Sequence, residues 1–274
     1  MINKKYVIGF FSFFLFSCFN SNANQSSNSD FLAYYNTFYA AETSFNEAIE
    51  MIDSSNDSDK IPEQAKLLLE QSMQNSLIIE NKFSNSQYLD DAYYILGRSS
   101  YLMNKVTASN YYFSRLINEF PSSKYNNEAK IWLGYLNLKI GNVLESKKSL
   151  LMLDKANDSE KRLLHLLSYE IYLHQGDFEF AEKSLIDAIE YSKKEQKLNI
   201  YNKLLIISEE NGYSAKCIKY LDLIEETQSI ENLDHILADK WMKYNIEAKN
   251  YKKSLDGLDK LISVAVKKDH LAKY

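Results

Sequence analysis

The side chains that could act as nucleophiles, general bases or metal ligands are few and scattered along the chain. The four histidines, His165, His174, His235 and His270, include no pair four residues apart with the glutamate that a zinc-binding helix needs. The sequence also has no glycine loop that could cradle a phosphate, no nucleophile elbow and no pair of cysteines spaced for a metal. We therefore expect no catalytic residues, no metal site and no dissociable cofactor, and predict that the protein is not an enzyme.

Cys18 is the one residue at which covalent chemistry is expected. Two lysines precede an apolar run of 11 residues, Tyr6–Phe16, which is too short for a membrane span of about 20 residues. The run ends in the sequence LFSC, which resembles the lipobox of bacterial lipoproteins. That resemblance implies a lipid on the Cys18 thiol and cleavage after Ser17. An ordinary signal peptide with an incidental cysteine is the alternative.

The segment after Cys18, FNSNANQSSNSD, is polar and has no apolar periodicity, as is typical of a flexible tether. We predict a signal peptide at 1–17, a lipidated tether at 18–30 and one helical domain at 31–274. Phe19 follows the cysteine where an aspartate would favour the inner membrane in enterobacterial lipoproteins, so the resemblance implies anchoring in the outer membrane, facing the periplasm. With Cys18 lipidated, Cys217 is left without a disulfide partner, and its apolar helical surroundings predict a buried thiol.

Composition favours an all-α fold. Only 7 glycines and 2 prolines occur in 274 residues, which leaves little material for hairpins and loops. The 45% hydrophobic and 25% charged residues are typical of a globular protein. A net charge of −5 argues against nucleic acid as the main partner, because phosphate binding needs a basic face.

An internal repeat organises the chain. Shifted by 37 residues, the segment 90–154 matches itself, with Ala92 on Ala129, Leu96-Gly97 on Leu133-Gly134, Val106 on Val143 and Ser109 on Ser146. The join FSNSQY at 83–88 likewise recurs as FPSSKY at 120–125, where the proline ends one helix and Ser122 or Ser123 is expected to cap the next. We expect the two mid-helix glycines to allow close helix–helix contact.

These motifs resemble the tetratricopeptide repeat (TPR), in the bacterial variant with the join FP-S-Y-EA. Turns between the two helices of a repeat are predicted at positions 104, 141, 176, 211 and 249. We predict an all-α, TPR-like α-solenoid: a right-handed superhelix of about five helix-turn-helix repeats that follows an N-terminal helix pair.

The TPR resemblance also predicts the working surface. In TPR stacks the first helix of each pair lines a concave groove that binds an extended peptide or a partner helix. The residues expected there in the two most regular repeats are Asp91, Tyr94, Arg98, Tyr101, Glu128, Ile131, Tyr135 and Lys139. Tyrosines mixed with arginine and lysine suit protein recognition, but the same tyrosines can equally pack one repeat against the next.

Lipobox and repeats together resemble the BamD family, lipoproteins of the outer-membrane β-barrel assembly machinery. The resemblance implies a scaffold without a cofactor other than the lipid on Cys18, whose partners are a β-barrel insertase and unfolded outer-membrane proteins. The alternatives are another envelope TPR adaptor, either a Tol-Pal or peptidoglycan coordinator or a pilotin-like protein, and a small ligand-capture lipoprotein. The absence of a sustained heptad and of large loop insertions argues against the coordinator and the capture protein, respectively.

Overall fold

The structure is a computed structural model that describes residues 31–32, 34–53, 60–227, 235–259 and 262. The predicted signal peptide, Cys18 and the predicted tether lie outside the described residues. Within those ranges every regular element is a helix. None of the described helices combines the length and the apolar character that crossing a membrane requires.

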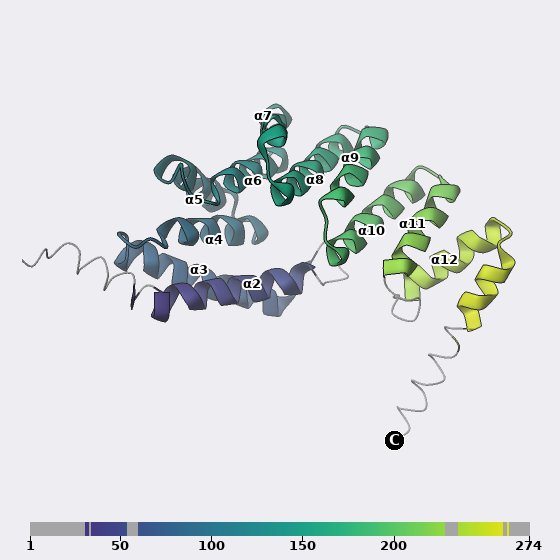
Figure 1. Ribbon diagram of the computed structural model, residues 1–274, viewed down its shortest axis with the longest axis horizontal. Helices are drawn as coiled ribbons and strands as arrows, with labels where there is room; N and C mark the ends of the chain where they lie inside the picture. The colour runs from purple at the N-terminus through teal and green to yellow at the C-terminus, as the bar shows by residue number, and fades with distance from the viewer. Residues whose placement is uncertain (1–30, 33, 54–59, 228–234, 260–261, 263–274) are drawn as a thin grey trace, which may run out of the picture.

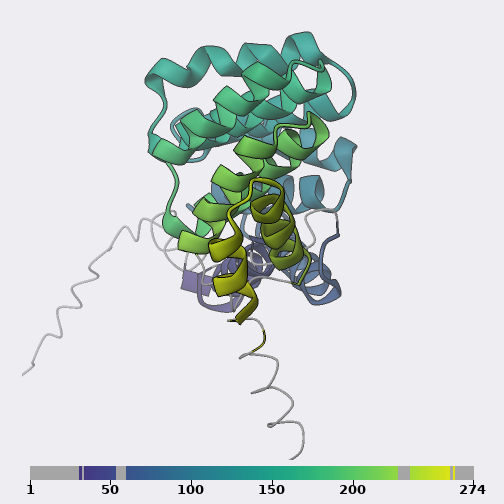
Figure 2. The same ribbon diagram turned by 90° about the vertical axis from the view of Figure 1, so that its right-hand side faces the viewer.

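The helices form consecutive pairs in which even-numbered helices come first and odd-numbered helices second. After a π-helical turn, η1 (Tyr34–Phe38), the first helices are α2 (Tyr39–Asp53), α4 (Leu89–Leu102), α6 (Asn126–Lys139), α8 (Asp158–His174), α10 (Lys194–Glu210) and α12 (His235–Glu247). The second helices are α3 (Glu63–Lys82), α5 (Val106–Glu119), α7 (Val143–Ser149, continued by the 3-10 helix η2, Leu150–Lys155), α9 (Phe178–Glu190), α11 (Ser214–Thr227) and a helical segment at 251–259. Figure 1 shows the pairs stacked in chain order along a curved array, and Figure 2 shows the same array from its C-terminal end.

The turns between paired helices share one backbone geometry. A positive φ occurs at Asn104, Gly141, Gly176, Gly212 and Lys249, at intervals of 37, 35, 36 and 37 residues. In each turn the following residue donates its N–H to the carbonyl five residues earlier, which is the Schellman bond that closes a helix C-terminus. The five predicted turns are therefore confirmed, with the fourth displaced by one residue, and the chain is a TPR-like α-solenoid.

The two mid-helix glycines mark close helix contacts, as predicted. A Cβ built on Gly97 would lie 2.6 Å from Cε1 of Phe113, which α5 packs against α4. A Cβ on Gly134 would lie 2.5 Å from the Ser149 hydroxyl oxygen and 2.8 Å from Cδ2 of Leu167. The glycines thus let the helices of a pair, and of neighbouring pairs, approach more closely than alanine would allow.

The joins between repeats differ from the prediction in one detail. The Ser123 hydroxyl accepts a hydrogen bond from the Tyr125 N–H at 3.2 Å, and Tyr125 rather than a serine occupies the N-cap of α6. Ser86 forms the same bond to Tyr88 before α4. These serines shape the turn that enters the helix and do not cap it, because the chain makes one further turn before helical geometry begins.

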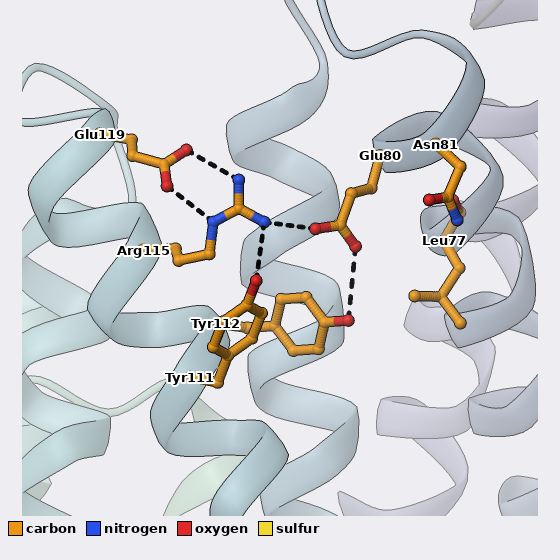
Figure 3. A network of polar contacts seen from close by, with 7 residues as sticks. All are labelled: Leu77, Glu80, Asn81, Tyr111, Tyr112, Arg115 and Glu119. Carbon is orange, nitrogen blue, oxygen red and sulfur yellow. Dashed lines mark hydrogen bonds and ion pairs between the residues drawn. The ribbon is translucent and has the colours of Figure 1, made fainter.

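Polar side chains tie each repeat to the next. In Figure 3 the Arg115 guanidinium of α5 binds both carboxylate oxygens of Glu119, the Tyr111 hydroxyl and Glu80 of α3. The Tyr112 hydroxyl donates to the second oxygen of Glu80 at 3.4 Å. A single carboxylate of one second helix is thereby held by an arginine and a tyrosine of the next.

The same arrangement recurs further along the solenoid with lysine in place of arginine. Glu182 of α9 accepts from Lys216 Nζ at 2.5 Å and from the Tyr220 hydroxyl at 2.7 Å, both on α11. Among the first helices, Glu209 accepts in the same way from Lys240 at 2.7 Å and Tyr244 at 3.4 Å. A lysine and a tyrosine four residues apart lie on one helix face, so both reach one carboxylate.

We expect Glu182→Gln to make folding less sensitive to acid. Burial alone raises the pKa of Glu182, but the hydrogen bonds from Lys216 and Tyr220 outweigh it and leave the pKa below the ordinary 4.5. A carboxyl with a lowered folded pKa stabilises the fold above about pH 4.5, and this contribution is lost as the pH falls through the lowered pKa. Urea denaturation should show the variant less stable by about 1 kcal/mol at pH 7, with the difference shrinking towards pH 3.

The control for this prediction is Glu179→Gln, an exposed carboxylate in the first turn of the same helix. In this variant the free energy of unfolding should change between pH 7 and pH 3 by about as much as it does in the unaltered protein. A stability gap between the Glu182 variant and the unaltered protein that stays constant with pH would contradict the prediction.

Candidate partner-binding face

The first helices α4, α6 and α8 contact one another in sequence, and the side on which they meet is here called the first-helix face. Residues 89–102 of α4 are buried or half-buried, and none of them is exposed. At its centre the Arg98 guanidinium carbon of α4 lies 3.4 Å from the centre of the Trp132 ring of α6. Tyr101 and Tyr135 flank that ring, with centroids 5.1 Å and 4.8 Å from it. We call these four residues the Arg98–Trp132 cluster.

The cluster is held in place by α8. The Tyr135 hydroxyl donates to the Leu163 carbonyl oxygen at 3.1 Å, which ties the ring of α6 to the backbone of the next repeat. Burial raises the pKa of Tyr135 well above its ordinary value and also raises that of Tyr101, so both rings stay neutral over the physiological range. The hydrogen bond fixes the Tyr135 ring before any partner arrives, and Tyr101 and Arg98 pack on the same Trp132 ring, which lowers the entropy that binding must offset.

Five of the eight residues predicted for the groove lie at or beside this cluster. Arg98, Tyr101 and Tyr135 belong to it and are half-buried. Glu128 accepts hydrogen bonds from the Tyr94 hydroxyl and, at 3.2 Å, from Trp132 Nε1. Lys139 is exposed, with its Nζ 5.1 Å from the centre of the Tyr101 ring.

The remaining three predicted residues need correction, because the structure buries them. Ile131 has no exposed surface and packs in the core. Tyr94 is 8% exposed and stacks on Tyr125 at 4.1 Å. Asp91 is 7% exposed, and its carboxylate pairs with Lys124 at 2.9 Å across the join. These side chains connect repeats and offer a partner almost no surface.

Two neighbours of the predicted residues were not predicted: Trp132, which is 7% exposed and lies under the Arg98 guanidinium, and Arg162. Trp132 follows Glu128 by four residues and precedes Tyr135 by three, so helical spacing alone places it on their side of α6. Arg162 lies on α8, in the third regular repeat, where the prediction was not extended. No sequence pattern marks Arg162. Its position directly before Leu163, whose carbonyl accepts from Tyr135, becomes informative only in the structure.

The charged groups that act on one another at the face are two arginines and the carboxylates of Asp53 and Glu128. Burial lowers the pKa of Arg162, and the nearby positive charge of Arg98 acts in the same direction. Desolvation raises the pKa of Asp53, at the end of α2, while the charges of Arg162 and Arg98 oppose that rise. The two guanidinium groups therefore lie within electrostatic range of each other and of Asp53, and Arg162 is also within range of Glu128.

Other candidate chemistry is absent from the part of the chain that the structure describes. In that part no group of three or more histidine, cysteine or acidic side chains is arranged to hold a metal ion. Cys217 is 1% exposed, as predicted for a structural thiol, and burial raises its pKa. A buried thiol of raised pKa is a poor nucleophile.

Comparison with known proteins does not identify the chain. No protein-family model matches the sequence, and no curated protein is similar to it. Among solved structures the chain is similar to the crystal structure of MamA protein, with 16% identity, a TM-score of 0.46 and coverage of 68% of this chain and 96% of the other.

Two further solved structures are similar at the same level. The crystal structure of PilW, described as a widely conserved type IV pilus biogenesis factor, gives 14% identity, a TM-score of 0.48 and coverage of 85% of this chain and 94% of the other. The APC/C hetero-tetramer Cut9-Hcn1 gives 12% identity, a TM-score of 0.34 and coverage of 89% and 57%. At these scores the similarities carry no argument about function, and the fold assignment rests on the helix pairs and turns described above.

Proposed function

We propose that the protein is a scaffold that binds a segment of another protein on its first-helix face. The observation that carries this proposal is the Arg98–Trp132 cluster, in which an arginine stacks on tryptophan between two fixed tyrosines. Arginine, tryptophan and tyrosine are the residue types that dominate protein–protein binding energy, and rigid side chains bind with little loss of entropy. Since the cluster spans two consecutive repeats, it suits an extended segment that runs along the array.

The resemblance of residues 15–18 to a lipobox extends the proposal to location. We propose that a lipid on Cys18 anchors the protein in the outer membrane, with the helical domain facing the periplasm, and that its work is the assembly of outer-membrane β-barrel proteins in the manner of the BamD family. The insertase and its unfolded substrates would then be the partners. An envelope adaptor of another kind, a Tol-Pal coordinator or a pilotin-like protein, or a small ligand-capture lipoprotein would use the same anchor and differ in the partner that it recovers.

Crosslinking in membranes tests the scaffold. A photo-reactive amino acid in place of Tyr101 should capture a partner protein, whereas the same group at Phe180, an exposed residue of the second helix α9, should not. Identification of the captured protein by mass spectrometry separates the alternatives: a β-barrel insertase or an outer-membrane protein supports the assembly role. Capture of a different envelope protein would overturn the assembly role but would still support a scaffold. Equal capture at Tyr101 and Phe180 would overturn the proposal that partners bind on the first-helix face.

The double variant Arg98→Ala/Tyr101→Ala should weaken binding of the captured partner by at least about 30-fold, the effect of losing a hot spot worth about 2 kcal/mol or more. The helical circular dichroism of the variant should remain, because neither residue belongs to the fully buried core. Loss of helical signal would show instead that the two residues are structural.

A further inference from the structure

Arg98 differs from Arg115 in how its nitrogen atoms are used. Its Nε and Nη1 are buried, yet neither has a hydrogen-bond acceptor within the described part of the chain. In Arg115, by contrast, Nε, Nη1 and Nη2 all donate to Glu80, Glu119 or Tyr111. A buried donor without an acceptor is unfavourable, and such groups in native proteins are explained by a missing ligand or water.

The stacking geometry limits the directions from which an acceptor can reach these buried donors. One face of the Arg98 group is covered by the Trp132 ring at 3.4 Å, so only its edge can take hydrogen bonds. The edge of a guanidinium presents parallel N–H groups whose spacing matches the two oxygens of a carboxylate. Stacking on an aromatic ring also fixes the orientation of that edge.

A second arginine strengthens the preference for an anion. Arg162 lies on α8 directly before Leu163, whose carbonyl accepts from Tyr135 of the cluster, and it is within electrostatic range of Arg98. Three carboxylates lie near the arginines. One oxygen of Glu128 accepts from both Tyr94 and Trp132, and Glu170 pairs with Lys203 at 3.6 Å. Asp53 lies within electrostatic range of both arginines but forms no hydrogen bond or ion pair with either among the described residues. Two partly buried positive charges within electrostatic range of each other are unfavourable, and an anion bound between them would remove that cost.

We propose that Arg98 and Arg162 together bind the carboxylate of an acidic side chain in the partner's extended segment, while an adjoining aromatic side chain packs on Tyr101 and Tyr135. This inference rests on the proposed function, since it names the chemistry of the segment that the first-helix face binds. The arginine fork provides selectivity for the carboxylate, and the rings provide the apolar contact area.

Two matched peptides test the carboxylate. One is a fluorescent, acetylated and amidated nonapeptide that alternates tyrosine or phenylalanine with aspartate and glutamate, and the other carries asparagine and glutamine at the acidic positions. Fluorescence anisotropy with the full helical domain should show at least about tenfold tighter binding of the acidic peptide, because hydrogen bonds to charged groups are the stronger ones. Raising the salt concentration should reduce this preference only partly, since the arginines are shielded from solvent.

Variants locate the effect. Arg98→Gln and Arg162→Gln should each remove most of the preference for the acidic peptide, and Arg98→Lys should retain part of it, because lysine keeps the charge but not the fork. Lys183→Gln, which removes an exposed charge on α9, is the matched control and should bind as the unaltered protein does. Thermal melts of each variant would show whether the fold persists, and an unchanged preference in a folded Arg98→Gln variant would overturn the assignment.

The outcomes separate this inference from the proposed function. Equal affinity for the two peptides, or no measurable binding of either, would overturn the carboxylate site. The scaffold would still stand if Tyr101 crosslinks a partner whose contacting segment, mapped by mass spectrometry, has no acidic residue. Failure of Tyr101 to crosslink any protein would overturn the scaffold itself, whatever the peptides do.

Discussion

Replacing Phe113 with alanine is expected to lower the free energy of unfolding by about 3–5 kcal/mol, which is the usual cost of removing a fully buried aromatic ring. Phe113 has no exposed surface, and its ring touches the backbone of α4 at Gly97. The cavity left by the ring would lie between the two helices of one repeat, where neither can move without disturbing the next pair. Chemical denaturation followed by far-ultraviolet circular dichroism measures the loss.

Gly97→Ala tests the same contact from the other side, and the sign of its effect is informative. Alanine in place of glycine favours a helix by about 1 kcal/mol, whereas overpacking a buried contact costs about 1–3 kcal/mol. Because the new Cβ would lie 2.6 Å from a buried ring, we expect overpacking to win and the variant to be less stable. Phe113→Leu removes the ring and with it the clash. The loss of stability caused by Gly97→Ala should therefore be smaller in the Gly97→Ala/Phe113→Leu double variant than in the unaltered background.

The control for this pair is Gly141→Ala. Gly141 has a φ of +81° and no atom within 4 Å of a built Cβ, so its substitution introduces backbone strain and no clash. Phe113→Leu should therefore leave the cost of Gly141→Ala unchanged. A stabilising Gly97→Ala, or equal rescue of both glycine variants, would contradict the close contact between α4 and α5.

The repeat register could be predicted from sequence because local geometry fixes it. A residue of positive φ after each first helix is required to close the turn, and glycine or asparagine at intervals of 35 to 37 residues meets that requirement at four of the five turns. Lys249 is the exception, because it is a bulky residue at φ +59°. Its turn is indicated in the sequence by the run Ala248-Lys249-Asn250-Tyr251, which corresponds to the earlier turns. At the fourth turn two neighbouring residues, Asn211 and Gly212, can both adopt the conformation, which explains the error of one residue.

The working surface was less predictable because it depends on how successive pairs rotate against one another. Spacing on α6 places Glu128, Ile131 and Tyr135 on overlapping sides of the helix, but only the packing of α4 and α8 decides which of them is covered. Ile131 faces the core and Trp132 faces Arg98, although the two are adjacent in sequence. Both side chains are buried, Ile131 completely and Trp132 to 7% exposure, but a difference of 100° around the helix turns one into the core and the other beneath Arg98, and the repeat period does not specify that angle.

Cys18→Ala is expected to move the protein completely from the membrane fraction to the soluble fraction. Each buried CH₂ of an acyl chain contributes about 0.8 kcal/mol to membrane binding, so the several chains implied by the lipobox anchor the protein stably and their loss abolishes the anchor. Fractionation of cells followed by immunoblotting measures the distribution. Labelling with a radioactive or clickable fatty acid should mark the unaltered protein and not the variant.

Cys217→Ala is the control that isolates the lipid from the loss of a thiol. Cys217 is buried in α11 and lies in the helical domain, so its substitution should lower stability by about 1 kcal/mol and leave both fractionation and labelling unchanged. If both Cys18→Ala and Cys217→Ala remain in the membrane fraction, Cys18 does not carry the anchoring lipid. The helical domain must then reach the membrane through a protein partner. In that case the photo-reactive group at Tyr101 should capture a membrane protein in both variants, because the Arg98–Trp132 cluster is built entirely from α4 and α6 and does not depend on residue 18.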